Sequence, residues 1–354
     1  MKSLSPIVLP PLGEHPLISV LVANYNYEDY VGEAVEAVLS QTYQNFELII
    51  CDDGSVDQSR EIIRRYISDP RIMLIEKENS GQASALNEAF AKSTGEIICL
   101  LDSDDSFLPE KLESVFKAFQ AHPDHGFCTH RTFPVNYRGR TLDMPIPRTL
   151  AQGWVAPSAL HNGGGDGFPS TVGLSFRRAV ADVIFPSPTH LFISPDGYLA
   201  RSASFITNII AIPEPLANYR LHDRNWRGVA APTVASMTSV LDDFHRNFEA
   251  VKNFVISYYN DDIAGELHPE DRGAYWEYIL ALYTLQGDRS GEVRGLSMDT
   301  ILSHIQPSRR RSIWSIIINV PPFVSRILFR LWWGKSPLKR YFNFIRAQIS
   351  RVIG

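Results

Sequence analysis

The sequence has little of what marks secreted, membrane-spanning or nucleic-acid-binding proteins. Its 354 residues include three cysteines, too few and too scattered for a disulfide framework, which favours a reduced, cytoplasmic setting. The formal net charge of -5 gives no reason to expect nucleic acid as a partner. Neither end contains the roughly 18 consecutive uncharged apolar residues that a membrane-spanning helix needs. We expect residues 1–16 to be a loose arm rather than a signal peptide.

The first 120 residues alternate between two hydrophobic patterns. Short, continuous apolar runs alternate with stretches whose apolar residues recur at helical spacing. Continuous apolar runs are typical of strands covered on both faces, as in a parallel sheet. The pattern predicts an α/β fold with a doubly wound, mostly parallel, Rossmann-like sheet and a ligand crevice outside the carboxyl ends of its strands. The predicted strands are Ile18–Ala23, Phe46–Cys51, Ile72–Glu76 and Ile97–Leu101.

Two helix boundaries are predicted from local signals. Ser55 and Gln58 have the spacing of a capping box, so that a helix is expected to begin there. Gly95 follows a helical stripe that includes Ala83 and Ala91, and it is predicted to be the C-cap of that helix.

The later part of the chain is less regular. Residues 161–167 (HNGGGDG) fit either a lid or acceptor loop, or a flexible surface excursion. The segment from Arg309 is basic and aromatic, and two interpretations of it stay open. It fits a C-terminal helical extension packed on the main body, or pieces lying peripherally in the interface of a membrane's inner face. We divide the chain into an arm (1–16), a main domain (17–230, with halves 17–120 and 121–230), a helical region (231–305) and a tail (306–354).

Acidic and polar residues follow three of the predicted strands. Asn24 and Tyr25 come after the first, Asp52 and Asp53 after the second, and Asp102-Ser103-Asp104-Asp105 after the fourth. Carboxylates gathered in one crevice repel one another unless a cation or donor groups compensate them. Hard oxygen ligands favour Mg²⁺ or Mn²⁺, which commonly bridges a carboxylate and substrate phosphates. Each motif alone also fits an ordinary turn or helix cap.

Taken together, the motifs resemble those of family-2 glycosyltransferases of the GT-A fold, over about residues 17–226. These enzymes use nucleotide-sugar donors and invert the anomeric centre. The motifs occur in the family's order, which makes the resemblance specific. The matching segments are Ser19–Tyr43, Phe46–Ser59, Glu78–Phe90, Gly95–Glu113, Pro169–Arg178, Ile193–Leu199 and Tyr219–Trp226.

The resemblance implies a binding site for the donor. By it, Tyr25 stacks on the nucleotide base and Asp53 accepts the base N–H, while Asp52 either supports this turn or only caps its backbone. Asp102 would contact the ribose or the donor sugar. The implied donor-binding residues are Ala23, Tyr25, Asp52, Asp53, Gly81, Gln82, Asn87, Asp102 and Ser103.

The resemblance also implies a metal site and a catalytic base. Asp104 would bind Mg²⁺ or Mn²⁺, Asp105 would contribute to the metal or sugar site, and His222 would supply a further metal or diphosphate contact. Asp196 occupies the position of the aspartate that deprotonates the acceptor. A solvated loop histidine and an ordinary turn aspartate are the alternatives for His222 and Asp196.

The implied reaction is a metal-dependent, inverting, hexosyltransferase-type transfer (EC 2.4) to an acceptor hydroxyl. UDP is the commonest nucleotide in the family. The acceptor would be a glycan, a lipid-linked molecule or a protein, with surface polysaccharide or glycan biosynthesis as the setting, and the sequence does not indicate an oligomeric state. Arg224-Asn225-Trp226 lacks the upstream glutamine of the QxxRW signature of polymer synthases, so that one sugar per acceptor is expected.

Two other functions were weighed. A nucleotidyltransferase would carry a glycine-rich GxGTR-like loop after the first strand, where Asn24-Tyr25-Asn26-Tyr27 stands instead. A catalytically inactive scaffold or regulatory protein need not keep together the four residues Asp53, Asp102, Asp104 and Asp196. Both alternatives are therefore disfavoured.

Overall fold

The chain forms two compact units. A computed structural model describes residues 3–162, 164–191, 194–222, 225, 233–269, 273–287, 292–293, 296–305 and 308–333. Unit 1 comprises Met1–Arg220 and Arg246–Leu267, and unit 2 comprises Leu221–His245 and His268–Gly354.

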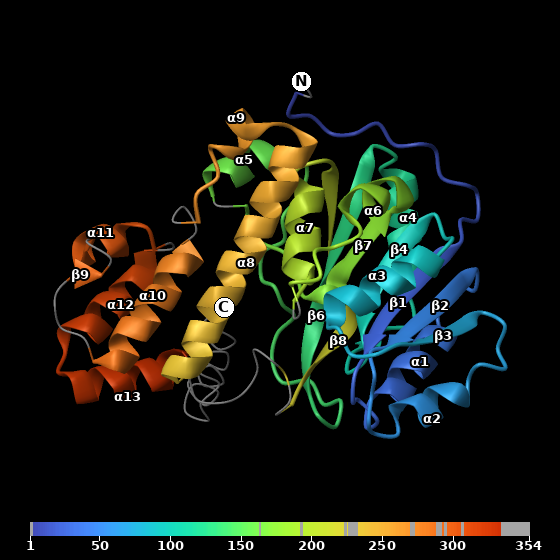
Figure 1. The fold of residues 1–354 in the computed structure, drawn as a ribbon, viewed down its shortest axis with the longest axis horizontal. Helices are drawn as coiled ribbons and strands as arrows, with labels where there is room; N and C mark the ends of the chain where they lie inside the picture. Colours follow the sequence, from blue (N-terminus) through green and yellow to red (C-terminus); the bar gives the residue numbers. More distant parts are fainter. Residues whose placement is uncertain are drawn as a thin grey trace, which may run out of the picture. The chain divides into compact units, whose positions relative to one another are not determined.

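The elements of both units are drawn in Figure 1. The strands are β1 (Ile18–Asn24), β2 (Phe46–Asp52), β3 (Ile72–Glu76), β4 (Ile97–Asp102), β5 (Ser106–Phe107), β6 (His125–Asn136), β7 (Leu174–Arg177), β8 (Asn208–Leu221), β9 (Glu292–Val293) and β10 (Leu296–Ser297). The helices are α1 (Val31–Leu39), α2 (Ser59–Arg64), α3 (Gln82–Lys92), α4 (Lys111–Ala121), α5 (Ala156–His161), the 3₁₀ turn η1 (Thr171–Gly173), α6 (Arg178–Ile184), α7 (Asp196–Ser204), α8 (Val234–Tyr258), α9 (Asp261–Ala264), α10 (Gly273–Gln286), α11 (Met298–Ser303), α12 (Ser308–Asn319) and α13 (Pro322–Trp333).

Unit 1 is built on an eight-stranded sheet in the order β3-β2-β1-β4-β7-β6-β8-β5. The first four strands in this order are parallel to one another. Beyond them, β7 pairs antiparallel with both β4 and β6, and β5 pairs antiparallel with β8. The four predicted strands are all present, and the predicted α/β fold class is confirmed.

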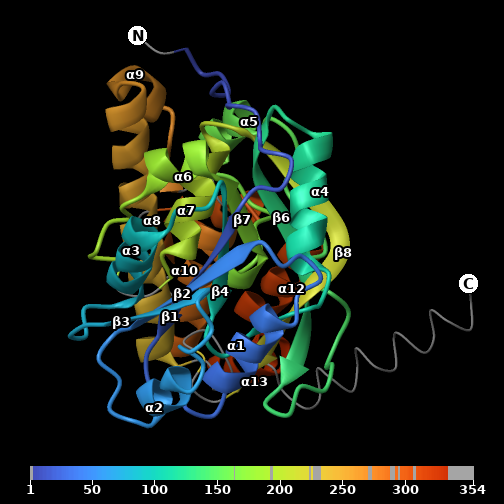
Figure 2. The ribbon, with the colours of Figure 1, turned by 90° about the vertical axis from the view of Figure 1, so that its right-hand side faces the viewer.

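The central strands are covered on both faces, which explains their continuous apolar sequences. Alternate residues of β1 enter different cores: Leu21 belongs to one cluster, and Val20 and Val22 belong to the other. The first cluster includes buried residues of α3, α6 and α7, and the second includes buried residues of α1, α2 and α4. Figure 2 shows α3, α6 and α7 on one side of the sheet and α4 on the other. The sheet therefore forms the middle layer of three.

The register of the parallel strands brings their carboxyl ends to one level. Asn24 of β1 lies opposite Asp52 of β2, and Ala23 lies opposite Asp102 of β4. The residues that follow these strands therefore emerge at the same edge of the sheet, as a doubly wound fold requires.

Two predicted helix boundaries are wrong. α2 begins at Ser59, not at Ser55, because the Ser55 hydroxyl accepts hydrogen bonds from the backbone N–H of Asn26 and the side chain of Asn24. α3 ends at Lys92 with Ser93 as its cap. Gly95 instead lies where a Cβ would stand 2.6 Å from the backbone nitrogen of Ser19, so its lack of a side chain permits close packing of the chain.

Unit 2 has a core of its own. Buried aromatic and aliphatic side chains of α10, α11, α12 and α13 make up most of it, among them Trp276, Trp314 and Phe329. β9 and β10 form a short antiparallel pair. Among the described residues, no helix has both the length and the apolar character that crossing a bilayer requires.

Candidate active site

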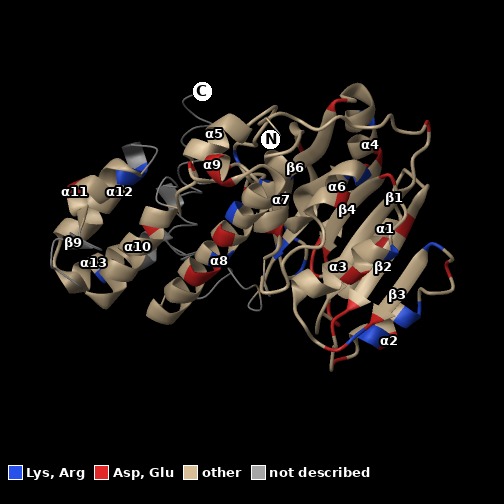
Figure 3. Ribbon diagram, turned by 45° about the horizontal axis from the view of Figure 1, so that its top comes forward, with Lys and Arg blue, Asp and Glu red and all other residues tan. Residues whose placement is uncertain are grey.

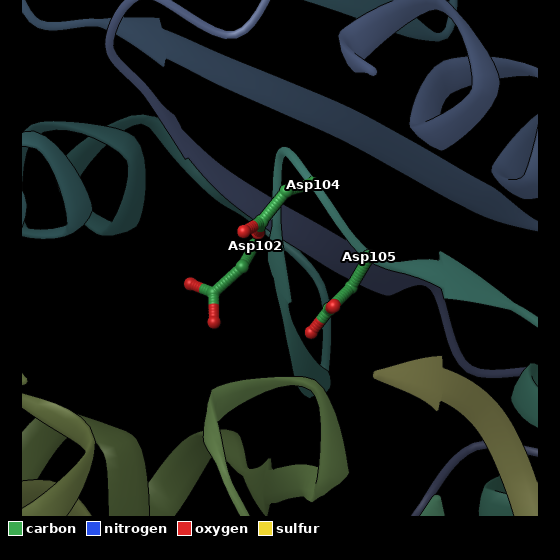
Figure 4. Close-up of side chains that lie close together, drawn as sticks. All are labelled: Asp102, Asp104 and Asp105. Atoms are coloured by element: carbon green, nitrogen blue, oxygen red, sulfur yellow. The ribbon is translucent and has the colours of Figure 1, made fainter. Parts of the chain in front are cut away.

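Three aspartates of one turn form the centre of the candidate site. Asp102 is the last residue of β4, and the backbone N–H of Asp105 donates to its carbonyl oxygen at 3.0 Å, which closes the turn. One carboxylate oxygen from each of Asp102, Asp104 and Asp105 lies within 4.8 Å of the others. Figure 4 shows the three side chains projecting from this single turn. The turn thus concentrates negative charge at the edge where the sheet's ligand crevice is expected.

Neighbouring groups satisfy only part of this carboxylate cluster. The Gln82 side-chain amide donates to Oδ1 of Asp102 at 2.8 Å, and the backbone N–H of Arg220 donates to Oδ1 of Asp105 at 2.7 Å. The other oxygen of Asp105, Oδ2, is buried and has no hydrogen-bond partner among the described residues. A buried carboxylate oxygen without a donor is costly unless a cation or a proton compensates it.

Crowding of carboxylates shifts the acid–base behaviour of the site. Burial, followed by the charges of Asp104 and Asp196, raises the pKa of Asp102 above its usual value. Burial and the charges of Asp104 and Asp102 likewise raise the pKa of Asp105, against the opposing effect of Arg220. The raised pKa values mean that the ionised forms of Asp102 and Asp105 are destabilised in the folded protein.

Arg220 stabilises the aspartate turn through its guanidinium group. Its guanidinium Nε donates to the carbonyl oxygen of Asp104 at 2.8 Å, and another of its nitrogens lies 2.5 Å from a carboxylate oxygen of Glu33. The guanidinium carbon also lies 5.1 Å from the centre of the Tyr30 ring. Arg220 was missed as a site residue, although it stands within the Tyr219–Trp226 motif.

Two half-buried tyrosines, Tyr27 and Tyr219, also lie near the cluster and were not predicted. Burial and the charges of the three aspartates raise the pKa values of Tyr27 and Tyr219. Both phenols are therefore neutral beside the acidic turn. Tyr27 lies in the YNY segment after β1, and polar aromatic residues there were the available signal.

The donor set fits a hard divalent cation. All the candidate ligands in the turn are carboxylate oxygens, which Mg²⁺ and Mn²⁺ prefer, and Asp105 Oδ2 is an unsatisfied oxygen among them. Asp102, Asp104 and Asp105 are thus brought together as the sequence pattern suggested. His222 belongs to unit 2, where its backbone N–H donates to the side chain of Asn225 at 2.6 Å, and its role as a metal ligand stays a prediction.

A second polar group lies at the end of β2. Asp53 is 3% exposed, and its carboxylate accepts from Lys77 Nζ and from the backbone N–H groups of Ser80 and Gly81, at 2.7, 3.0 and 2.7 Å. Gly81 has φ 92°, a conformation that favours glycine. Asp53 and Gly81 are therefore joined, and Asp53 fixes the loop that leads into α3.

Asp52 fixes the turn that follows β2. Its two carboxylate oxygens accept from the backbone N–H of Ser55 at 2.9 Å and from the Asn24 side chain at 2.7 Å. Because the residue is fully buried, these contacts fit the role of a backbone cap better than a contact with the donor.

The remaining predicted residues after β1 and β4 lie at the same edge of the sheet. The Ser103 hydroxyl donates to the carbonyl oxygen of Ala23 at 2.8 Å, which ties the β4 turn to the end of β1. Tyr25 is 44% exposed, so its ring is accessible for stacking. Strands β2 and β4 flank β1, which puts their ends about 10 Å apart.

Helix α3 connects this edge to the segment that carries Asp196. The Asn87 side chain makes hydrogen bonds with both the backbone N–H and the carbonyl oxygen of Ser187, each at 2.8 Å. At the start of α3, Gln82 Oε1 accepts from the backbone N–H of Ser194 at 3.3 Å. Asp196 begins α7 two residues later, and its charge acts on Asp102. Asp196 therefore belongs to the electrostatic neighbourhood of the aspartate turn.

In its sequence, the chain is similar to glycosyltransferases. The family model described as glycosyl transferase family 2 matches residues 19–165. An uncharacterized glycosyltransferase of Nostoc sp. is 35% identical over 213 residues, which cover 59% of this chain and 66% of that protein. A putative teichuronic acid biosynthesis glycosyltransferase, TuaG, of Bacillus subtilis is 42% identical over 100 residues, 28% of this chain and 40% of the relative. The chain therefore spans less than two thirds of the length of these curated relatives. Among solved structures, S. aureus TarS 1-349 is 15% identical with a TM-score of 0.48, and the match covers 89% of each chain.

Proposed function

We propose that this chain, whose residues 19–165 match the model of glycosyl transferase family 2, transfers a sugar from a nucleoside-diphosphate sugar to an acceptor hydroxyl with inversion at the anomeric carbon. The observation that carries the proposal is the turn after β4. It presents three carboxylates within 4.8 Å of one another, and one of them has a buried oxygen that no group in the described part of the chain contacts by a hydrogen bond. This edge of the sheet also carries the side chains that the family motifs assign to the donor.

The nucleotide-sugar donor would bind at the ends of β1, β2 and β4. Tyr25 stacks on the base, Asp53 and the backbone around Gly81 line the nucleotide site, and Asp102 with Ser103 faces the ribose or sugar. UDP is the first nucleotide to test, because it is the commonest in the family. Ala23, Gln82 and Asn87 complete the donor set, with Asp52 as the cap of its turn.

The metal ion would be bound by carboxylate oxygens of the aspartate turn. Asp104 and Asp105 would hold Mg²⁺ or Mn²⁺, and His222 is proposed as a further ligand. When bound, such an ion neutralises charge on the diphosphate, which is typically worth several kcal/mol. It would also offset the burial and the repulsion between carboxylates, which together raise the pKa values of Asp102 and Asp105.

The chemical step that this chain's residues supply is a proton transfer. The acceptor oxygen forms a bond to the anomeric carbon while the bond from that carbon to the diphosphate oxygen breaks. Asp196 takes the proton of the acceptor hydroxyl, and the electron pair of the broken bond leaves with the diphosphate. General-base help of this kind typically contributes about 10²–10⁴-fold. A single displacement inverts the anomeric configuration.

The acceptor is proposed as a glycan, a lipid-linked molecule or a protein in surface polysaccharide or glycan biosynthesis. The chain's similarity to TuaG, a putative teichuronic acid biosynthesis glycosyltransferase, supports this setting. The proposal is tested with a panel of nucleotide sugars, each with Mn²⁺ or Mg²⁺, by following release of the nucleoside diphosphate. Release from one donor, dependent on the metal, is expected. A protein that releases no nucleotide and is not stabilised by UDP, GDP or dTDP with either metal would be a scaffold instead.

A further inference from the structure

Basic and acidic residues are distributed unevenly along this chain. From residue 300 to residue 354 the sequence contains ten lysines and arginines and no aspartate or glutamate. The first 299 residues contain 24 basic residues against 39 acidic ones. The modest net charge of -5 therefore conceals a strongly cationic segment that follows an anionic body. Figure 3 shows Lys and Arg, and no Asp or Glu, on α12 and α13.

The helices α12 and α13, which lie in this cationic segment, have two different apolar faces. One face packs into the core of unit 2 through Trp314 and Phe329, both of which are fully buried. On their other sides, Ile316 of α12 and Phe323 and Ile327 of α13 are exposed by 59%, 69% and 54%. Phe323 and Ile327 are four residues apart and so lie on the same side of α13. Packing in the core of unit 2 accounts for the buried apolar side chains of these helices, but not for the exposed ones.

We propose that an α12–α13 surface, made of Ile316, Phe323 and Ile327 with Arg310, Arg311 and Arg326 of the same helices, docks onto an anionic lipid bilayer. Large apolar side chains interleaved with arginines are typical of helices that lie in a membrane interface. Ten basic residues without an acidic one supply the attraction to anionic headgroups. The helices would lie on the bilayer, since no described helix is able to cross it.

The same features disfavour two other occupants. A second copy of this surface would bring two uniformly cationic segments together, which repel each other. Nucleic acid would satisfy the positive charge, but it offers no apolar phase in which Phe323 and Ile327 would be buried. A bilayer satisfies both properties at once. This inference does not depend on the proposed transferase activity.

The test is co-sedimentation of the full chain with vesicles. We expect binding to vesicles that contain phosphatidylglycerol, weak binding to pure phosphatidylcholine, and a loss of binding at high salt. Replacing both Phe323 and Ile327 by serine is expected to weaken the binding about 10–100-fold, because two partly buried apolar side chains contribute on that order. The control is Val8→Ser with Met144→Ser, which removes two exposed apolar residues of unit 1.

Several results would overturn the proposal. Equal vesicle binding by the double variant and wild type would remove the surface from the interaction. A chain that binds no vesicles but loses a dimer on mutation would make the surface a contact between copies, and preferential binding to DNA would assign it to nucleic acid. Circular dichroism and melting temperature are measured for each variant, and Ile316→Ser provides a second variant if the double variant fails to fold.

The side-chain amide of Gln82 makes hydrogen bonds through both its nitrogen and its oxygen. Its Nε2 donates to Asp102 at 2.8 Å, and its Oε1 accepts from the backbone N–H of Ser194 at 3.3 Å. Ser194 has φ 61°, an uncommon conformation for serine, and stands two residues before Asp196. The amide thus links the aspartate turn to the start of the segment that carries the proposed base.

We infer that Gln82, whose amide nitrogen and oxygen are both engaged by this chain, acts as a positioning residue instead of the donor ligand that the family motifs suggest. It fixes Asp196 relative to Asp102, and this inference rests on the proposed function. A displacement of about 1 Å in an active site is able to cost on the order of 10²-fold in rate. Asn87 makes the equivalent attachment to Ser187 five residues further along α3. The helix therefore serves as the support for the chain that leads to α7.

The test is the kinetics of Gln82→Met, which keeps the length and loses both hydrogen bonds. We expect kcat to fall about 10–100-fold while the KM for the donor changes less than about threefold. The control Gln58→Met alters an exposed glutamine and is expected to be neutral. A raised donor KM with unchanged kcat would make Gln82 a donor ligand, and unchanged kinetics would leave it without a role. Absence of transfer by wild type would instead overturn the proposed function, and with it this inference.

Discussion

At the scale of single residues, the acidic side chains of the site differ in how fully their neighbours satisfy them. One oxygen of Asp52 accepts a hydrogen bond from its own turn and the other from the Asn24 side chain at the end of β1. Asp53 is bound by Lys77 and two backbone N–H groups. Asp105 keeps one buried oxygen that has no hydrogen-bond partner within the described ranges. The first two therefore stabilise loops, whereas Asp105 has capacity for a ligand.

Asp196 is predicted to act on the acceptor and not on the donor. Asp196→Asn keeps the size of the side chain but removes its basicity, so turnover should fall at least about a hundredfold. Binding of the nucleoside diphosphate should stay within a few-fold of wild type. Steady-state turnover and calorimetric binding measure the two quantities separately. Near-normal turnover in the variant would show that another group takes the proton.

Asp104 is predicted to be needed for the effect of the metal. In Asp104→Ala, the rise in melting temperature caused by UDP with Mn²⁺ should disappear, because the ion loses a charged oxygen ligand. The matched control is Asp143→Ala, which removes an exposed carboxylate of unit 1. If both variants keep the full stabilisation, the aspartate turn does not hold the ion.

The sequence was more informative about which residues approach one another than about what each of them contacts. Strand ends and motif order were sufficient to place Asp102, Asp104 and Asp105 at one edge of the sheet. Arg220 could not be found in this way, because its contacts with Asp104 and Glu33 join residues far apart in the chain. Tertiary contacts of this kind leave no local pattern.

At the scale of elements, the buried strands were predictable and the helix boundaries were not. A strand covered on both faces must be apolar throughout, so β1, β2 and β4 are visible in the sequence. The Ser55 hydroxyl, by contrast, was free to cap a helix or to bond elsewhere, and the nearby Asn24 and Asn26 decided the outcome. Competition between equivalent local partners is settled by packing.

Gly81, which precedes α3, is predicted to be sensitive to substitution. Its φ of 92° with ψ of 162° is a conformation that is almost restricted to glycine, so Gly81→Ala should cost about 1–3 kcal/mol of stability. The variant should also weaken nucleotide binding, because the backbone N–H of Gly81 holds Asp53. Chemical denaturation measures the first effect and calorimetry the second.

The control for this element is Gly32→Ala in α1. A Cβ at Gly32 would meet Ile62 at 3.5 Å, an ordinary van der Waals contact, and alanine favours a helix. Stability should therefore stay level or rise. If Gly81→Ala were equally well tolerated, the backbone before α3 would not be under the constraint inferred from its geometry.

At the scale of the whole molecule, the two units distribute their features differently. Unit 1 contains the eight-stranded sheet and the aspartate turn, and unit 2 has a helical core with the cationic helices α12 and α13. The net charge does not reveal this difference, because the acidic excess of residues 1–299 and the basic excess of residues 300–354 largely cancel.

The carboxylate cluster is predicted to make the stability of the metal-free chain depend on pH. Since the folded-state pKa values of Asp102 and Asp105 are raised, the folded state holds protons more tightly than the unfolded state does. The stability that they contribute is fully present below the unfolded value of about 3.9. It is lost as pH rises through the folded values. Asp105→Asn removes one of these carboxylates, so its advantage over wild type in melting temperature should grow as pH rises from about 4 toward neutrality.

Mn²⁺ should act in the opposite direction. A cation binds the ionised carboxylates, so the stabilisation of wild type by Mn²⁺ should be larger at neutral pH than near pH 5, and in Asp105→Asn it should be smaller at both. Melting curves across this pH range, with and without the ion, measure all of these terms. Comparing each variant with wild type at the same pH removes the contribution of other titrating groups. A variant advantage that does not vary with pH would show that Asp105 carries no proton in the folded metal-free chain, and the electrostatic argument for a cation at this turn would then fail.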